Sequence, residues 1–460
     1  MSATRPLVVI DVVGLTRALM GAATPNLNRL AADGFGATLT PPLPALTCTS
    51  QATLLTGLPP RDHGIVANGW YFRDLAEVLF WRQANRLVQG EKVWETARRA
   101  RPTLTCANLF WWYNMGSTVD WSVTPRPVYP ADGSKIIAIY GEPPVLPAWL
   151  EEELGPFPFF HFWGPLAGLA SSQWIAAAAR LTFDRHRPDL TLVYLPHLDY
   201  DLQRFGPDSP AAAKAVREID TVAGALIDHV RGAGAEVVVC SEYGIEAVDR
   251  PVYLNRVLRE AGWLRVRETA VGELLDPFVS RAFAVADHQV AHLYLRDPAD
   301  MEGARRLLGR VAGVEQLLDG AGQRAVGLDH PRSGELVAVA APGAWFTYDY
   351  WLDDARAPDF ARTVDIHRKP GYDPRELFLD PTLRHPQLRI ARRLLQKRLG
   401  MRYLMDVIPL DGTLVRGSHG RLPSTPAAGP VLLGSNRTGE CEAMEMAAVR
   451  DLLLRQLDAG

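Results

Sequence analysis

The segment PLVVIDVVGLTRALMGAATPNLNRLAADGFGATLT, residues 6–40, contains two apolar runs with a helical pattern between them. The runs Pro6–Val13 and Ala37–Thr40 are short and bounded by chain-breaking residues, as are strands that are covered on both faces. Between them, Thr24-Pro25 gives an N-cap residue followed by proline, and Gly34 stands where a helix ends. A strand, a helix and a second strand in this order predict an α/β fold.

The same alternation continues along the chain. Further short apolar runs predict strands at Thr103–Phe110, Leu190–Pro196, Glu236–Cys240 and Val431–Gly434. Apolar residues at helical spacing predict helices at Ser172–Arg185, Ser209–Arg231 and Cys441–Leu457. This order is typical of an α/β/α sandwich around a mostly parallel sheet, in which polar residues just beyond the strand ends form the functional site.

Residues 266–405 have a different pattern, with the segment HLYLRD, a helical pattern near Asp300–Val311 and the aromatic run WFTYDYWLDD. We therefore predict that residues 1–265 form the first part of a catalytic core, residues 266–405 an inserted α+β cap, and residues 406–460 the return to the core. Within the cap, Leu388–Gly400 predicts a basic amphipathic helix. Such a helix either contacts a membrane or a partner, or is an ordinary solvated surface, and the sequence favours the second interpretation.

Composition narrows the class of protein. The chain has 460 residues, of which 47% are hydrophobic and 22% charged, and its formal net charge is −3. These values are typical of a globular protein and argue against a partner that is a nucleic acid polymer. The 4 cysteines include no CxxC pair, which indicates reduced thiols. With no leader-like start and no apolar run of roughly 18 residues, we expect a cytoplasmic protein without a transmembrane segment; the oligomeric state stays open.

Polar side chains follow several predicted strands. Asp11 ends the first strand, Asp199 follows the run TLVYLPHL, and Glu242 and Tyr243 follow Glu236–Cys240. The loop PALTCTSQATLLTG places Thr47 before a helix-like run, where the helix dipole favours anions. The same set includes Asn68 in HGIVANGWY, Gln203, and His419 in VRGSHGR. Oxygen and imidazole groups in this arrangement predict a site that binds one or two cations and activates a hydroxyl.

The motifs around these residues resemble the alkaline phosphatase superfamily, in its nucleotide pyrophosphatase/phosphodiesterase (type I phosphodiesterase) and phosphonoacetate hydrolase branch. The similar segments are VVIDVVGL, TPNLNRLAADGFGATLTPPLPALTCTSQATLLTGLPPRDHGIVANGWY, YLPHLDYDLQRFGPDSP and GSHGRLP. The resemblance implies an alkaline-phosphatase-like sandwich in which Thr47 is the nucleophile and Asn68 stabilises charge on the transferred phosphoryl group. It also implies metal ligands at Asp11, Thr47, Asp199, Gln203, Glu242, Tyr243 and His419.

Two departures from the family pattern affect the metal. The family has histidine where this chain has Gln203, and Asp-His where this chain has Glu242-Tyr243. Zinc prefers nitrogen and sulfur donors, whereas an oxygen-rich set suits Mg²⁺, Mn²⁺ or Ca²⁺ better. We expect one or two divalent ions (Zn, Mn or Mg). Tyr243 is either a ligand or a hydrogen-bonding group, because an un-ionised phenol is a poor ligand.

Other residues are candidate contacts for the substrate. These are His288 and His292 in ADHQVAHLYL, His367 in DIHRKPGYDP, and the aromatic residues Trp70 and Trp112. For the histidines, a structural or substrate-binding role is favoured over metal ligation. The segment around His288 and His292 reads as a strand, although their spacing also fits one face of a helix. The aromatic residues either pack in the core or hold an apolar or ring-bearing leaving group.

Together these features predict a metal-dependent phosphoester hydrolase that acts through Thr47 on a small organic phosphate. Two alternatives stay open. One is a transferase that passes the phosphoryl group to an alcohol, which a dry aromatic cap would favour. The other is a catalytically altered protein that binds a phospho-ligand.

Overall fold

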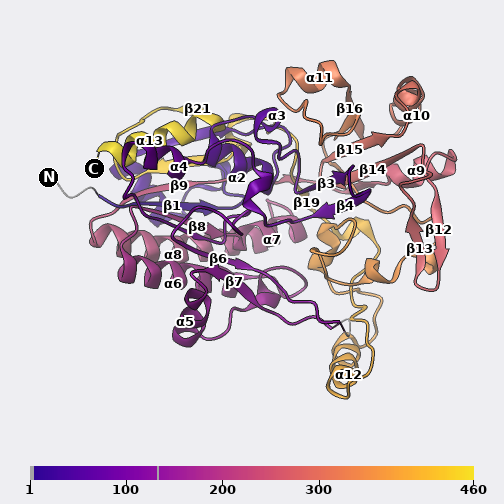
Figure 1. Cartoon of the computed structure of the whole chain (residues 1–460), viewed down its shortest axis with the longest axis horizontal. Coiled ribbons are helices and arrows are strands. Elements are labelled where there is room, and N and C mark those ends of the chain that lie inside the picture. Colours follow the sequence, from indigo (N-terminus) through magenta and orange to yellow (C-terminus); the bar gives the residue numbers. More distant parts are fainter. Residues whose placement is uncertain (1–4, 132–133, 460) are drawn as a thin grey trace.

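A nine-stranded sheet forms the centre of the protein in the computed structural model, which describes residues 5–131 and 134–459 (Figure 1). Its order is β21-β2-β20-β9-β1-β8-β5-β6-β7. The strands are β1 (Leu7–Val12), β2 (Phe35–Thr40), β5 (Cys106–Leu109), β6 (Trp121–Pro125), β7 (Ile139–Glu142), β8 (Leu190–Leu195), β9 (Glu236–Cys240), β20 (Val431–Gly434) and β21 (Ala443–Glu445). Residues 1–4, on which part of the cytoplasmic expectation depends, lie outside the described part of the chain.

The middle of this sheet is parallel. Strand β1 pairs in parallel with β8 on one side and with β9 on the other, in registers that set Asp11 opposite Tyr194 and Cys240. Strand β20 is antiparallel to both β9 and β2, so β2 runs in the same direction as β9. The carboxyl ends of β1, β2, β8 and β9 therefore lie along the same side of the sheet, perpendicular to the strands.

Helices cover both faces of the sheet, and the predicted α/β/α sandwich is confirmed (Figure 1). One face carries α1 (Pro25–Asp33), α5 (Val145–Leu154), α6 (Leu169–His186), α7 (His197–Phe205) and α8 (Pro210–Gly232). The other carries α2 (Thr47–Thr56), α3 (Pro60–His63), α4 (Val93–Ala100) and α13 (Val449–Ala459). Strands β1, β5, β8 and β20 are buried throughout because helices lie on both sides, which explains their mostly apolar sequences, whereas β7 and β21 at the two edges are partly exposed.

One predicted element is wrong. The sequence predicts a helix over Cys441–Leu457, but residues Ala443–Glu445 form strand β21 and the helix α13 begins at Val449. Strand β21 pairs in parallel with β2 and forms the edge of the sheet, so ladder hydrogen bonds to β2 outweigh the local helical pattern. The four cysteines are free thiols, as expected.

The second region of the structure contains a smaller antiparallel sheet in the order β14-β15-β17-β16. Its strands are β14 (Ala282–Asp287), β15 (Val290–Leu295), β16 (Val314–Leu318) and β17 (Leu336–Ala340). Two-stranded pairs join β3 (Gly69–Phe72) to β4 (Glu77–Phe80), β10 (Glu246–Ala247) to β19 (Gly417–Ser418), β11 (Arg250–Val252) to β18 (Ala344–Phe346), and β12 (Val266–Thr269) to β13 (Gly272–Leu275). The helices are α9 (Leu254–Glu260), α10 (Met301–Leu308), α11 (Gly320–Ala325) and α12 (Pro386–Arg398). The division into core and cap at residues 265 and 405 stays a prediction.

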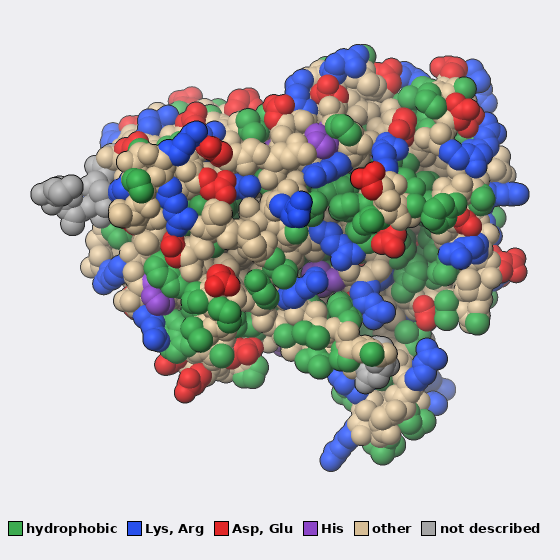
Figure 2. Space-filling model, viewed as in Figure 1, with side chains coloured by type: hydrophobic (Ala, Val, Ile, Leu, Met, Phe, Trp, Pro, Cys, Tyr) green, Lys and Arg blue, Asp and Glu red, His purple; other side chains and the backbone are tan. Residues whose placement is uncertain are grey.

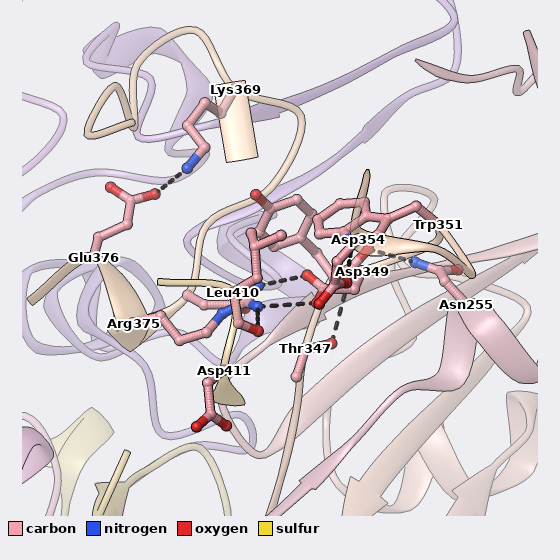
Figure 3. Close-up of polar contacts among 12 residues, drawn as sticks. Asn255, Thr347, Asp349, Trp351, Asp354, Lys369, Arg375, Glu376, Leu410 and Asp411 are labelled. Carbon is pink, nitrogen blue, oxygen red and sulfur yellow. Dashed lines mark hydrogen bonds and ion pairs between the residues drawn. The ribbon is translucent and has the colours of Figure 1, made fainter. Parts of the chain in front are cut away.

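A buried ionic network anchors the segment 363–380 to this region (Figure 3). Arg375 donates to Asp349, with Nη1 3.0 Å from Oδ2, and also pairs with Asp373. Lys369 Nζ lies 2.5 Å from Glu376 Oε1, and both side chains are 2% exposed. Because each charge has an opposite partner, the network fixes the backbone of a segment that would otherwise be an irregular loop.

Removing one member of this network is expected to cost much of the protein's stability. Arg375→Met leaves Asp349 and Asp373 buried without their cation, and we expect the free energy of unfolding to fall by about 3–5 kcal/mol. Arg306→Met is the matched control, because its pair with Glu302 on α10 is 65% and 68% exposed. The control is expected to stay within about 0.5 kcal/mol. Urea denaturation of both variants measures the difference, and equal losses would contradict the network's role.

Candidate functional site

Three strand ends bring the predicted acidic residues together. Asp11 is the fifth residue of the six-residue strand β1, Glu242 follows β9 by two positions, and Asp199 lies in the first turn of α7, directly after β8. Since β8, β1 and β9 are parallel neighbours, these side chains lie at the same edge of the sheet. All three are buried.

Thr47 is the first residue of α2. Its hydroxyl lies 3.1 Å from the phenol oxygen of Tyr243. The N-cap residue, Leu46, offers no side-chain hydrogen bond to the helix, and every residue of α2 is buried. At the amino end of this buried helix the backbone N–H of Cys48 donates to Asn68 Oδ1 at 2.9 Å, and the helix dipole at this end, next to the Thr47 hydroxyl, favours an anion.

Two carboxyl groups face each other beside Thr47. Gln51, one turn further along α2, donates from Nε2 to Glu242 Oε1 at 2.6 Å and to Asp11 Oδ2 at 3.3 Å. Its own Oε1 accepts from the backbone N–H of Trp112 at 2.7 Å, which fixes the orientation of the amide. Asp11 Oδ1 and Glu242 Oε2 find no hydrogen-bond partner among the described residues. Burial raises the pKa of both carboxyl groups, and their proximity raises that of Glu242 further.

The phenol of Tyr243 connects Thr47 to Asp199. Tyr243 donates to Asp199 Oδ1 at 3.1 Å, so the Thr47 hydroxyl is left to donate to the phenol oxygen. Gln203 Nε2 donates to the other carboxylate oxygen, Oδ2, at 2.6 Å. Burial raises the pKa of Asp199 to about 7. Burial, and then the Asp199 charge, raise the pKa of Tyr243 well above its ordinary value, so the phenol stays protonated.

Two imidazole rings complete this side of the site. The ring of His419 stacks on that of Tyr243, with centroids 3.6 Å apart and planes 3° from parallel. His419 Nδ1 lies 3.0 Å from the carbonyl oxygen of Ala45 and therefore carries the proton, which leaves Nε2 as an acceptor. Burial lowers the pKa of His419 to about 3. The ring of His288 lies 4.0 Å from that of His419, and its Nε2 lies 2.9 Å from the Tyr372 hydroxyl.

Asn68 already has partners on both sides of its amide. Its Oδ1 accepts from the backbone N–H of Cys48 at 2.9 Å, and its Nδ2 donates to Asp287 Oδ1 at 3.2 Å and to the Tyr372 hydroxyl at 3.1 Å. Tyr372 in turn donates to Asp287 at 3.0 Å. The amide thus lies directly behind the amino end of α2, and a bound anion would have to compete for its donor group.

These side chains border a small cavity of about 30 Å³, room for about two water molecules. It is lined by the polar residues Thr47, Asp199, Gln203, Tyr243, His288 and His419, and by the apolar or aromatic residues Trp81, Trp112, Phe162, Trp163, Tyr194, Tyr200, Ile366 and Tyr372. Asp11, Asn68 and Glu242 lie behind this lining. The site therefore combines a polar wall on the core side with a predominantly aromatic wall opposite.

Three residues predicted to contact substrate do not line the cavity. His292 uses both ring nitrogens, since Nε2 lies 3.1 Å from Val66 O and Nδ1 accepts from Gly334 N at 3.1 Å. Trp70 is buried and stacks on Phe72 with centroids 4.8 Å apart. His367 lies behind Trp112, with ring centroids 6.4 Å apart. The contacts of His292 and Trp70 are those of packing residues, and a substrate-binding role for them stays a prediction.

The segment that holds His288 and His292 is a hairpin. Strand β14 ends at Asp287 and β15 begins at Val290, so His288 lies in the turn, at φ +56°, whereas His292 lies within a strand. The two side chains therefore do not share one strand face or one helix face. Sequence reasoning also did not identify Gln51, Asp287 and Tyr372 as members of the site, although Asp287 and Tyr372 lie in the segments ADHQVAHLYL and DIHRKPGYDP that hold the candidate histidines.

The donor set fits one oxygen-ligated cation better than two zinc ions. Among the residues described, no three His, Cys, Asp or Glu side chains are close enough to hold a metal ion. The two unpartnered oxygens of Asp11 and Glu242, next to the Thr47 hydroxyl, suit a hard cation. Around Asp199 the arrangement is different, because both carboxylate oxygens already accept hydrogen bonds. There the chain offers the single imidazole of His419 and the amide oxygen of Gln203, a poor set for zinc.

Comparison with known proteins identifies the family. The model of the type I phosphodiesterase / nucleotide pyrophosphatase family matches residues 7–373, and the chain belongs to this family. The family consists of phosphodiesterase and pyrophosphatase hydrolases of the alkaline phosphatase superfamily. No helix in the described ranges is long and apolar enough to span a membrane.

Individual relatives are distant. The chain is 27% identical over 235 residues to an uncharacterized pyrophosphatase/phosphodiesterase of Schizosaccharomyces pombe, covering 48% of this chain and 41% of that protein. It is 23% identical over 257 residues to ectonucleotide pyrophosphatase/phosphodiesterase family member 1 of Mus musculus, covering 54% of this chain and 24% of that protein. The matched segments thus span less than half of these relatives.

Two solved structures share the fold across nearly the whole chain. Murine ectonucleotide pyrophosphatase/phosphodiesterase 5 in complex with AMP has a TM-score of 0.60 at 16% identity, covering 99% of this chain and 95% of that one. Phosphonoacetate hydrolase from Sinorhizobium meliloti 1021 in complex with phosphonoformate has a TM-score of 0.61 at 16% identity, covering 99% and 96%. The alkaline-phosphatase-like fold expected from the sequence is therefore correct.

Proposed function

We propose that the protein is a phosphoester hydrolase that uses Thr47 as its nucleophile on a small organic phosphate. The observation that carries the proposal is the position of Thr47, whose side chain lines the cavity at the amino end of α2. Anions bind favourably at such helix ends, and the same dipole lowers the cost of forming an alkoxide. A phosphoryl group in the cavity would therefore lie next to a hydroxyl that is ready to attack.

The hydrogen-bond chain supplies a path for the proton. As the Thr47 oxygen attacks phosphorus, its proton passes to the phenol oxygen of Tyr243, and the phenol proton passes to Asp199 Oδ1. The bond from phosphorus to the leaving oxygen breaks, and the phosphoryl group stays on Thr47. A base with a pKa near 7 is well suited to accepting a proton at neutral pH. Burial raises the pKa of Asp199 to about 7. When water displaces Thr47 from phosphorus, the same path returns the proton.

A divalent cation fits beside the nucleophile. Asp11, Glu242 and Thr47 would hold it, and Mg²⁺ or Mn²⁺ suits these oxygens better than Zn²⁺. Such a cation lowers the pKa of a bound hydroxyl and polarises a phosphoryl oxygen. Gln51 would keep both carboxylates in place through its fixed amide.

The aromatic wall of the cavity indicates which class of substrate the site accepts. Trp112 and Trp81 pack with ring centroids 4.6 Å apart at the cavity, and Trp163 and Tyr372 stand beside them. These side chains suit an apolar or ring-bearing leaving group. The ligands of two structural neighbours are consistent with a small phosphorus-containing substrate, because one neighbour was solved with AMP and another with phosphonoformate. A phosphodiester or organic phosphate of modest size is therefore the proposed substrate class.

Replacing the nucleophile is expected to abolish turnover. With an aryl phosphodiester and added Mn²⁺, Thr47→Ala should lose at least about 10³-fold in kcat, because no other group is positioned to attack. Thr49→Ala is the matched control, since Thr49 lies in the same helix, is buried, and has a hydroxyl without a partner among the described residues. Activity in Thr47→Ala, or an equal loss in both variants, would contradict the assignment. Product analysis with an added alcohol separates hydrolysis from transfer.

The proton path gives a pH-dependent prediction. Below pH about 7 Asp199 is protonated and accepts no proton, so the rate should rise with pH through about 7. Tyr243→Phe breaks the path while keeping the stacked ring, and we expect kcat to fall about 10²-fold or more and the rise near pH 7 to disappear. A pH profile of kcat for both forms tests this. An unchanged profile in Tyr243→Phe would argue against the phenol as the proton carrier.

A further inference from the structure

Helix α12 (Pro386–Arg398) is attached to the protein by its polar face. Arg389 and Arg393 pair with Asp406, and Arg393 Nη2 lies 3.0 Å from Asp406 Oδ1. No residue of the helix is buried. In Figure 1 the helix projects from the body of the molecule, well away from the nine-stranded sheet. It therefore contributes little to the hydrophobic core, and its apolar residues need another explanation.

Those apolar residues form a stripe that points to solvent. Leu388, Leu395 and Leu399 are 67%, 56% and 65% exposed. They stand at positions i, i+7 and i+11 of the helical pattern, which places them on one face at about 100° per residue. Leu394 and Met401 nearby are 52% and 53% exposed. A surface helix of a globular protein normally turns its apolar stripe toward the core, so α12 has the reverse orientation.

The charge around this stripe has one sign. Basic residues occur at Arg384, Arg389, Arg392, Arg393, Lys397, Arg398 and Arg402, and no acidic residue occurs between Asp380 and Asp406. Within the described residues, Arg392, Lys397 and Arg398 form no ion pair. In the helical pattern Arg392 and Arg398 stand on the two sides of the leucine stripe. In Figure 2 the projecting lobe, which corresponds to α12 in Figure 1, carries basic and hydrophobic side chains on its visible surface.

We propose that α12 docks the protein on an anionic membrane surface. A helix with an exposed leucine stripe and flanking arginines matches the helices that lie in the plane of a lipid interface, apolar face inward. Each basic residue near an anionic surface strengthens binding further, and the absence of acidic residues over this stretch leaves that attraction unopposed. The 13 residues of the helix give a contact about 20 Å long. An acidic protein groove or a second copy of the chain is the competing occupant.

Docking would bring the cavity-lining segment close to the lipid. The chain runs directly from segment 363–380, which supplies Ile366 and Tyr372 to the cavity, into α12. Asp380 N donates to Val407 O at 2.8 Å, and Val407 N donates to Arg362 O at 3.0 Å. The chain that leads into α12 and the chain that leaves it are therefore held together next to segment 363–380. The proposed docking surface and one wall of the cavity thus belong to one continuous piece of chain.

Vesicle binding of the full-length protein tests the proposal. Co-sedimentation with phosphatidylcholine/phosphatidylglycerol vesicles should give strong binding, and pure phosphatidylcholine vesicles weak binding. Leu395→Glu/Leu399→Glu should weaken binding at least about tenfold. Arg392→Ala and Arg398→Ala should each weaken it about fivefold. Leu352→Glu, at a leucine that is 47% exposed elsewhere on the surface, should bind as the unaltered protein does.

Three results would overturn the proposal. One is absence of binding to anionic vesicles. The second is equal binding by the Leu395→Glu/Leu399→Glu variant, which would mean that α12 does not contact the lipid. The third is self-association in sedimentation velocity that this variant abolishes while vesicles stay unbound, which would assign the stripe to a second copy of the chain. Since the altered side chains are exposed, an unchanged thermal unfolding midpoint checks that each variant is folded.

Discussion

Two buried carboxyl groups at the ends of neighbouring parallel strands are the constraint on which this site depends. The register of β1 with β9 brings Asp11 and Glu242 together, and burial makes their charges costly unless something compensates. Gln51 supplies one donor to each carboxyl group, yet one oxygen of each is left without a partner among the described residues. A cation or a shared proton has to complete the arrangement. Gln51 ties helix α2 to both carboxyl groups, and Thr47 lies at the start of the same helix.

Tyr243 changes the chemistry of the other half of the site. At the position where the family resemblance implies an imidazole, this chain has the phenol of Tyr243, which stacks on His419 and links Thr47 to Asp199. The phenol and Gln203 together occupy both oxygens of Asp199. Gln203 and Tyr243, which stand where the resemblance implies two nitrogen ligands, thus make hydrogen bonds to Asp199 instead. On this view the chain keeps the nucleophile and exchanges a second metal for a proton path.

Much of the core could be predicted from sequence because its signals are local. The strands β9 and β20 fall at the predicted residues, and the helix from Pro25 ends before Gly34 as its capping residues indicate. The membership of Gln51 could not be predicted, since its role depends on Asp11 and Glu242 meeting across the sheet. Likewise, Tyr372 reaches Asn68 only after a separation of 304 residues along the chain. The exposed leucines of α12 are a third case, because periodicity gives a stripe without saying which way it faces.

We propose that this site holds one cation, at Asp11 and Glu242, and that Tyr243 and Gln203 prevent a second. Elemental analysis after dialysis against Mn²⁺ or Zn²⁺ measures this directly. We expect about one bound ion per chain, lost in Glu242→Gln, and about two in the Gln203→His/Tyr243→His variant, which supplies the imidazoles that the resemblance implies. Two ions in the unaltered protein, or one ion that survives Glu242→Gln, would contradict it.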